Sequence, residues 1–208
     1  MNAVRFEGVS KRFGRRQVLR EFSASFGEGV SLLAGANGSG KTTVLNLAAG
    51  VLAPDAGSIL VMDAPVQSAK GRVFLAPSAA PAIPWLSGRA FIEFAAGLFA
   101  TRIRREEVQR IVGALGLVPH IDKPLGEMSS GTAKKVVIAS AFASGAPVLL
   151  FDEPTNELDA ASIGFFLDLV HASREKVVVI ATHRTEQFDA DARAVVTLDL
   201  EHQLRGET

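Results

Sequence analysis

A glycine-rich stretch, GANGSGKTT at residues 35–43, constrains the fold of this chain more than any other feature. It fits the pattern G-x-x-x-x-G-K-[ST] in full, and it lies between a short apolar run, residues 30–34, and a helical pattern, residues 42–49. Glycines let backbone N–H groups converge on an anion that also faces the positive end of the following helix. The pattern therefore predicts a strand, a phosphate-binding loop and a helix, which is a unit of an α/β fold.

The chemistry of this loop predicts which groups bind a nucleoside triphosphate. We expect the Lys41 ammonium to bridge the terminal phosphates and the Thr42 hydroxyl to coordinate Mg²⁺. An ordinary glycine-rich turn is the alternative, but the full pattern arises by chance in only about one per cent of chains of this length. The residues expected to bind the nucleotide are Gly35, Ala36, Asn37, Gly38, Ser39, Gly40, Lys41, Thr42 and Thr43.

A second apolar run ends in two carboxylates, within VLLFDEPTNELD at residues 148–159. In open α/β sheets, ligands gather beyond the carboxyl ends of the strands. We therefore expect Asp152 beside the glycine-rich loop, where it can hold Mg²⁺ through water. Glu153 is expected to polarise an attacking water as a general base. The alternative for this stretch is a solvated acidic turn.

A third apolar run, VVVIATHR at residues 177–184, brings a histidine to the same predicted edge of the sheet. A lone histidine is commonly structural. Because His183 follows Thr182 at a ligand-facing edge, we favour a contact with the γ-phosphate.

Strand and helix patterns alternate along the chain, which favours an α/β fold with a parallel sheet. Between residues 86 and 142 the apolar period is helical, and this block looks like an inserted lobe. Its first helix is expected to place Phe91, Phe94, Ala95 and Leu98 on one face. The expected strands are residues 3–6, 18–26, 30–34, 58–62, 72–75, 148–151, 177–181 and 195–198, and further helices are expected at residues 42–49 and 160–171.

These patterns predict one domain over residues 1–208. Its core comprises about residues 1–77 and 146–208, and its helical lobe about residues 86–142. Twenty-two basic residues balance 22 acidic ones, so no global field attracts nucleic acid, and we expect no nucleic-acid partner. Cysteine is absent, the N-terminus has no signal-like apolar core, and no apolar run reaches the length of a membrane span.

The stretch MSSGTAKKV, residues 128–136, precedes the acidic strand end and resembles the signature sequence of ATP-binding cassette (ABC) proteins, commonly written LSGGQ. NELD, residues 156–159, resembles the D-loop of that family, and His183 its switch histidine. SKRFGRRQVL, residues 10–19, resembles the N-terminal hairpin whose aromatic residue stacks on adenine. The resemblance covers nearly the whole chain in the family's order. It implies a P-loop NTPase core of the ABC type, with a mixed sheet, an antiparallel N-terminal part and an inserted α-helical lobe.

The resemblance also implies how two chains share the nucleotide. Ser129 and Gly131 match the signature residues that bind the γ-phosphate held by the loop of a partner chain, and helix capping alone is the alternative. One loop and one signature per chain imply a head-to-tail homodimer that buries two ATP molecules. Phe13 matches the aromatic residue that stacks on adenine, the alternative being a core aromatic.

One position departs from the family pattern. Where the family places a glutamine between the core and the helical lobe, the match falls on Ser78, in FLAPSAAP. A serine hydroxyl can coordinate Mg²⁺ or water, but it is shorter than glutamine and offers no amide.

The resemblance implies an ATPase subunit of an ABC transporter that uses ATP and Mg²⁺. Its partner would be a separate integral membrane permease, which would hold it at the cytoplasmic face of the cell membrane. The short helical lobe and the absence of a C-terminal regulatory domain favour export. A soluble ABC ATPase that acts as a scaffold or remodelling factor is the second hypothesis. A small-molecule kinase is disfavoured, because no acceptor site or lid motif accompanies the signature.

Overall fold

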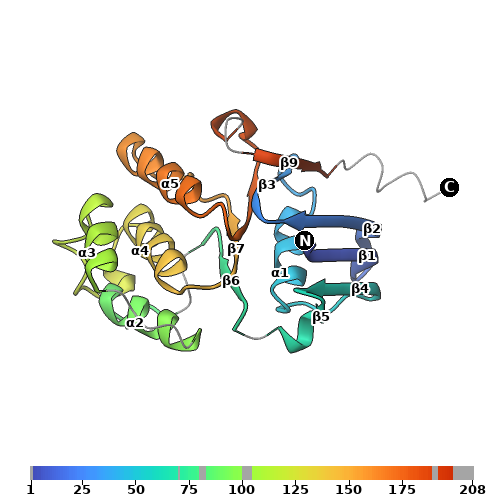
Figure 1. The fold of residues 1–208 in the computed structure, drawn as a ribbon, viewed down its shortest axis with the longest axis horizontal. Coiled ribbons are helices and arrows are strands. Elements are labelled where there is room, and N and C mark those ends of the chain that lie inside the picture. The colour runs from blue at the N-terminus through green and yellow to red at the C-terminus, as the bar shows by residue number, and fades with distance from the viewer. Residues whose placement is uncertain (1, 70, 80–82, 100–104, 189–191, 199–208) are drawn as a thin grey trace.

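The computed structural model describes residues 2–69, 71–79, 83–99, 105–188 and 192–198. Two sheets and five α-helices make up this part of the chain. In Figure 1 the larger sheet stands near the middle, with α2, α3, α4 and α5 on one side and α1 with the smaller sheet on the other. The chain is therefore layered, as the alternation of strand and helix patterns predicted.

The larger sheet is parallel and has the strand order β6-β7-β8-β3-β9. Every residue of β3, β7 and β8 is buried, because helices cover one face of the sheet, and α1 with the antiparallel sheet covers the other. Such strands read as continuous apolar runs, which is why they were found from the sequence. The strands are β6 (Val73–Ala76), β7 (Val148–Asp152), β8 (Val177–Thr182), β3 (Gly29–Ala34) and β9 (Ala192–Thr197).

The smaller sheet is antiparallel and has the order β2-β1-β4-β5. Its first two strands form a long hairpin, in which Phe13 faces Arg16 beside the turn. Val4, Phe6 and Val9 of this hairpin are buried. The strands are β1 (Asn2–Phe13), β2 (Arg16–Gly27), β4 (Ala56–Val61) and β5 (Ala64–Pro65).

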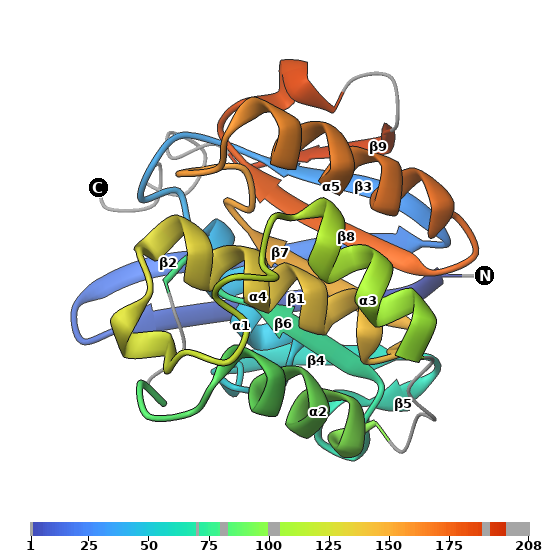
Figure 2. The same cartoon turned by 90° about the vertical axis from the view of Figure 1, so that its left-hand side faces the viewer.

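The helices divide between the two sides of the parallel sheet. Figure 2 shows α2, α3, α4 and α5 in front of the sheet when the molecule is viewed from that side. The α-helices are α1 (Lys41–Ala48), α2 (Gly88–Leu98), α3 (Arg105–Ala114), α4 (Ser130–Ala143) and α5 (Ala160–Ala172), and short 3₁₀ turns are η1 (Val66–Ser68), η2 (Leu125–Glu127) and η3 (Thr185–Gln187). The segment between β6 and β7 thus holds α2, α3 and α4, in the block with helical periodicity.

Strand β7 contributes to two hydrophobic cores. Val148 and Leu150 pack with α1 and the antiparallel sheet, whereas Leu149 and Phe151 pack with α4 and α5. Successive side chains of a strand point to opposite faces, so one buried strand serves both cores. On the α5 side, edge-on aromatic contacts join Phe166 to Phe151, with ring centroids 5.2 Å apart. Packing on both faces holds the carboxyl end of β7 in place.

The prediction for α2 was wrong in part. Phe91 and Ala95 are buried as expected, but Phe94 and Leu98 are 54% and 61% exposed. The buried face instead runs through Ile92 beside Phe91, because α2 packs mainly on α4. Within the described ranges, no helix has the length and apolar character needed to cross a membrane.

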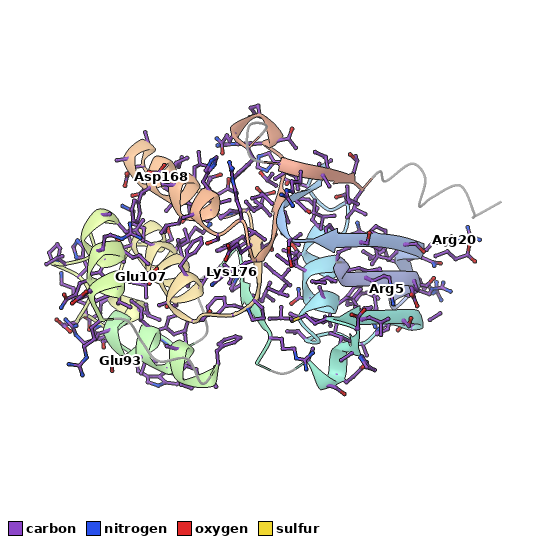
Figure 3. The ribbon with its side chains drawn as sticks, viewed as in Figure 1. Arg5, Arg20, Glu93, Glu107, Asp168 and Lys176 are labelled. Atoms are coloured by element: carbon purple, nitrogen blue, oxygen red, sulfur yellow. The ribbon has the colours of Figure 1, made fainter. Side chains whose placement is uncertain are left out.

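Charged side chains lie on the outside of this arrangement. Figure 3 places Arg5 and Arg20 on the antiparallel sheet, and Glu93, Glu107 and Asp168 on the outer helices. The interior charges are few, and those near the carboxyl ends of the parallel strands define the site described next.

Candidate nucleotide-binding site

The glycine-rich loop joins β3 to α1, as the sequence predicted. Gly40 precedes the first residue of α1 and has a φ of 100°, a left-handed conformation that strains any residue with a side chain. At Gly35 a Cβ atom would lie 2.6 Å from Ser39 Oγ and 2.7 Å from the Leu198 carbonyl oxygen. Glycines are therefore required at both ends of the loop for the backbone to curl around the start of α1.

Lys41 is the charged centre of the loop. Its side chain is only 6% exposed, and its ammonium donates to the carbonyl oxygens of Gly35 at 2.7 Å and Ala36 at 3.2 Å. The same ammonium lies 3.5 Å from Glu153 Oε1. A buried ammonium needs partners for its three N–H groups, and here the loop and Glu153 supply them.

The three residues predicted to hold a metal ion meet at one carboxylate. The Thr42 hydroxyl donates to Asp152 Oδ2 at 2.9 Å, and Ser78 lines the same pocket, close enough to act on the Asp152 carboxylate. Burial raises the pKa of Asp152 above its ordinary value, although the hydrogen bonds from Thr42 and Ser78 act in the opposite direction. Two hydroxyls and a carboxylate form a set of hard oxygen donors.

Glu153 and His183 lie together at the ends of neighbouring strands. His183 Nδ1 is 3.0 Å from both carboxylate oxygens of Glu153, and the Thr182 hydroxyl lies 3.4 Å from Oε2. Glu153 has a φ of 47°, so its backbone is left-handed, which is unfavourable for a glutamate. Its side chain is only 12% exposed. A strained, largely buried carboxylate therefore lies between a lysine and a histidine.

Glu153 lines a pocket of about 410 Å³ together with Lys41 and Asp152, whereas His183 contacts Glu153 from outside the lining of that pocket. Phe13 lies at the pocket with 48% of its surface exposed, and Lys11 Nζ is 5.7 Å from the centre of its ring. This exposure contradicts the alternative of a core aromatic and leaves part of the ring accessible to a planar ligand. The pocket residues are Phe13, Arg16, Val18, Asn37, Gly38, Gly40, Lys41, Thr42, Thr43, Ser78, Asp152 and Glu153.

The two signature residues do not line this pocket. Ser129 caps α4, since its hydroxyl accepts from the Thr132 N–H at 3.2 Å and contacts the Thr132 hydroxyl at 2.8 Å. Gly131 packs against the next loop, where a Cβ atom would lie 2.5 Å from the Glu157 carbonyl oxygen. Ser129 is exposed, so it can accept a contact from outside the chain.

Two basic residues that the sequence did not indicate also lie at the site. Arg16 lines the pocket and donates to the Gly38 carbonyl oxygen at 3.1 Å. Lys134 is 7% exposed and donates to the Glu153 carbonyl oxygen at 3.2 Å. Lys134 could have been noticed as a lysine within the apolar pattern of a buried helix, because lysine is seldom buried without a partner.

The residues present suit a magnesium-bound triphosphate. A loop with open glycine positions at a helix N-terminus suits phosphate oxygens, and Lys41 supplies a countercharge. In proteins, Mg²⁺ is commonly bound by one or two carboxylates together with the phosphates of the substrate. Asp152, Thr42 and Ser78 fit that role. Within the described ranges, no group of three or more His, Cys, Asp or Glu side chains is placed to hold a metal ion.

Known proteins share both the sequence and the fold. Residues 19–156 match the family described as ABC transporter. The zinc transport system ATP-binding protein AdcC of Streptococcus pneumoniae is 30% identical over 201 residues, which cover 90% of this chain and 86% of that protein. The cytochrome c biogenesis ATP-binding export protein CcmA of Sphingopyxis alaskensis is 32% identical over 179 residues, covering 86% of this chain and 82% of that protein.

A solved structure described as the ATP-binding subunit of an ABC transporter superposes with a TM-score of 0.85. The match covers 94% of this chain and 85% of that one, at 19% identity, and it supports the fold.

A phosphate loop between a buried strand and a helix, with a carboxylate at the end of another strand of the same parallel sheet, defines a P-loop nucleotide-binding protein. Within that class, the matches in sequence and in fold place the chain more narrowly. The chain belongs to the ABC transporter family, among its ATP-binding subunits.

Proposed function

We propose that the chain binds and hydrolyses ATP in the pocket between the glycine-rich loop and the carboxyl end of β7. The convergence of Lys41, Asp152 and Glu153 in that pocket carries the proposal. Phosphate oxygens would replace the loop carbonyls as partners of Lys41, whose ammonium would then also release the Glu153 carboxylate. Glu153 would accept the proton of the attacking water, while His183 holds the carboxylate and contacts the γ-phosphate.

The remaining pocket residues would position the nucleotide. The backbone of the glycine-rich loop, residues 35–43, would surround the phosphates, and Phe13, which lines the same pocket, would stack on adenine. Thr42, Asp152 and Ser78 would hold Mg²⁺. When bound, this ion would neutralise phosphate charge in the transition state.

A second copy of the chain would complete the site. Ser129 and Gly131 lie outside the pocket of their own chain, and Ser129 is exposed at the N-terminus of α4. In a head-to-tail dimer with two-fold symmetry, each helix N-terminus and serine hydroxyl would meet the γ-phosphate bound by the other chain. ATP would then hold two chains together, and hydrolysis would release them.

An integral membrane permease would be the second partner, and it would hold the subunit at the cytoplasmic face of the membrane. The printed names of AdcC and CcmA assign those relatives to transport and export. Exposed apolar side chains in and beside α2 support a partner contact there, because large exposed apolar groups commonly mark interaction sites. These are Trp85, Phe94 and Leu98.

Mutation of the proposed base tests hydrolysis. Glu153→Gln should retain ATP affinity and lose most turnover, at least about 10²-fold, because an amide cannot accept the proton. The matched control is Glu175→Gln, an exposed glutamate before the amino end of β8, which should behave as wild type. Phosphate release and isothermal titration with MgATP measure the two effects. Unchanged turnover in Glu153→Gln would remove Glu153 from its role.

The same variant tests both partners. With MgATP, Glu153→Gln should form a dimer in light scattering, and adding Ser129→Ala should weaken that dimer. Co-purification from detergent extracts of the native host should recover an integral membrane protein. A stable soluble complex without such a protein would favour the scaffold or remodelling hypothesis instead.

A further inference from the structure

A buried lysine connects the signature helix with the proposed catalytic base of the same chain. Lys134 lies in α4, four residues after Ser130, the first residue of the helix. Only 7% of its surface is exposed. Its ammonium donates to the Glu153 carbonyl oxygen at 3.2 Å. Burial lowers the pKa of Lys134, while the nearby carboxylates of Glu157, Asp152 and Glu153 favour its charged form.

The contact falls on a residue whose backbone needs support. Glu153 has a φ of 47°, and such a conformation persists only when its surroundings hold it. Its N–H donates to the Ala181 carbonyl oxygen at 2.9 Å, which fixes one side of the residue to β8. Its carbonyl oxygen accepts from Lys134 and, at a longer 3.4 Å, from the Asn156 N–H. Lys134 therefore provides the shorter of two contacts that fix the other side.

The start of α4 is attached to the same loop at two further points. Gly131 packs against the carbonyl group of Glu157, and Lys135 Nζ forms an ion pair with Asp159 at 2.5 Å. Lys135 and Asp159 are at the surface, so this pair is worth little by itself. The Lys134 contact differs from this surface ion pair, because Lys134 is buried and its ammonium donates to the backbone of Glu153, the proposed base.

We propose that Lys134 is a positioning residue for ATP hydrolysis, which holds the backbone of Glu153 so that its carboxylate faces the pocket. The inference rests on the proposed role of Glu153. Because Lys134 lies on the helix that begins at the signature, a displacement of α4 would move the carboxylate of the same chain. The signature of each chain would then act on both nucleotides, directly on the partner's and through Lys134 on its own.

Substitution of the ammonium tests the proposal. Lys134→Met keeps the length of the side chain and removes the donor, so kcat should fall by about tenfold to hundredfold while KM for ATP stays within about twofold. Lys134→Gln keeps an N–H donor on a slightly shorter side chain, and it should recover a clear part of the lost kcat. Loss of packing alone would give no such recovery.

A measurement without nucleotide separates positioning from activity. In hydrogen exchange of the full chain, the backbone amides of residues 153–158 should exchange faster in Lys134→Met than in wild type. Lys176→Met is the matched control, because burial also lowers the pKa of Lys176, and it precedes the opposite end of β8 (Figure 3). This control should change neither the exchange of residues 153–158 nor kcat.

Two results would overturn the inference. One is a Lys134→Met chain with wild-type kcat and wild-type exchange at residues 153–158. The other is an equal loss of kcat in the methionine and glutamine variants. Glu153→Gln is measured in the same series, so that the two proposals fail separately. If Glu153→Gln loses turnover and Lys134→Met does not, only the role of Lys134 is wrong.

Discussion

Replacing Gly131 by alanine should destabilise the chain, although alanine is the better helix former. Gly131 lies in the first turn of α4, where a Cβ atom would come within 2.5 Å of the Glu157 carbonyl oxygen. Close contacts between carbon and a carbonyl oxygen are about 3.3 Å, so the two segments would have to separate by roughly 0.8 Å. The obstacle is a backbone atom of a residue with a φ of 69°, and no rotamer change can relieve it.

The magnitude follows from two opposing effects. Overpacking costs about 1–3 kcal/mol, and a rigid backbone obstacle belongs to the upper part of that range, about 2–3 kcal/mol. Helix propensity returns about 1 kcal/mol, which leaves a net loss of about 1–2 kcal/mol. For a chain of 208 residues this corresponds to a fall in Tm of about 2–8 °C. Separating α4 from this loop would also lengthen the hydrogen bond from Lys134 to the Glu153 carbonyl oxygen.

Gly164→Ala provides the matched control. Gly164 lies within α5, and a Cβ atom there would meet nothing within 4 Å, so only helix propensity acts and Tm should rise by a few degrees. Differential scanning fluorimetry measures the Tm of each variant against wild type, and the change should be negative for Gly131→Ala and positive for Gly164→Ala. The reasoning is refuted if Gly131→Ala is as stable as Gly164→Ala.

Two further predictions concern the site and the loop beside it. His183→Ala should slow hydrolysis by about 10²-fold with little loss of ATP affinity, because His183 contacts Glu153; equal loss in turnover and in calorimetric affinity would indicate a structural histidine. The hydrogen bond from Lys135, with that from the Ser162 N–H, holds the pKa of Asp159 well below its ordinary value. The ionised Asp159 carboxylate therefore stabilises the folded chain above its unfolded-state pKa, and this stabilisation is lost as the pH falls towards its folded-state pKa. In urea denaturation, the free energy of unfolding of wild type should exceed that of Asp159→Asn by less at pH 3 than at pH 6. An equal advantage at both values would contradict this.

Much of the fold and the pocket could be predicted from the sequence, because local signals and tertiary structure agree there. The glycine-rich loop, the buried runs of β7 and β8 and the carboxylates after β7 are each explained by a rule that acts over a few residues. The fold class and the family were confirmed. The roles of the site residues stay predictions.

Other features depend on contacts between distant segments. The apolar spacing of α2 does not show that Phe94 and Leu98 face outward, because the position of α4 decides which face is covered. Lys134 looks like an ordinary helix residue until the chain places Glu153 beside it. Ser78 is expected at the metal site only through its match to the family pattern, and its place in the pocket beside Asp152 depends on how distant segments pack.

The shared position of β7 has a consequence for how the molecule opens. Because its alternate side chains belong to different cores, a fluctuation that loosens either core releases the strand that ends in Asp152. Protection from exchange at β7 should therefore follow the less stable of the two halves. A ligand that binds Asp152 would stabilise the strand that both cores share. Such a ligand would raise the midpoint temperature of unfolding and would make the two cores unfold more cooperatively.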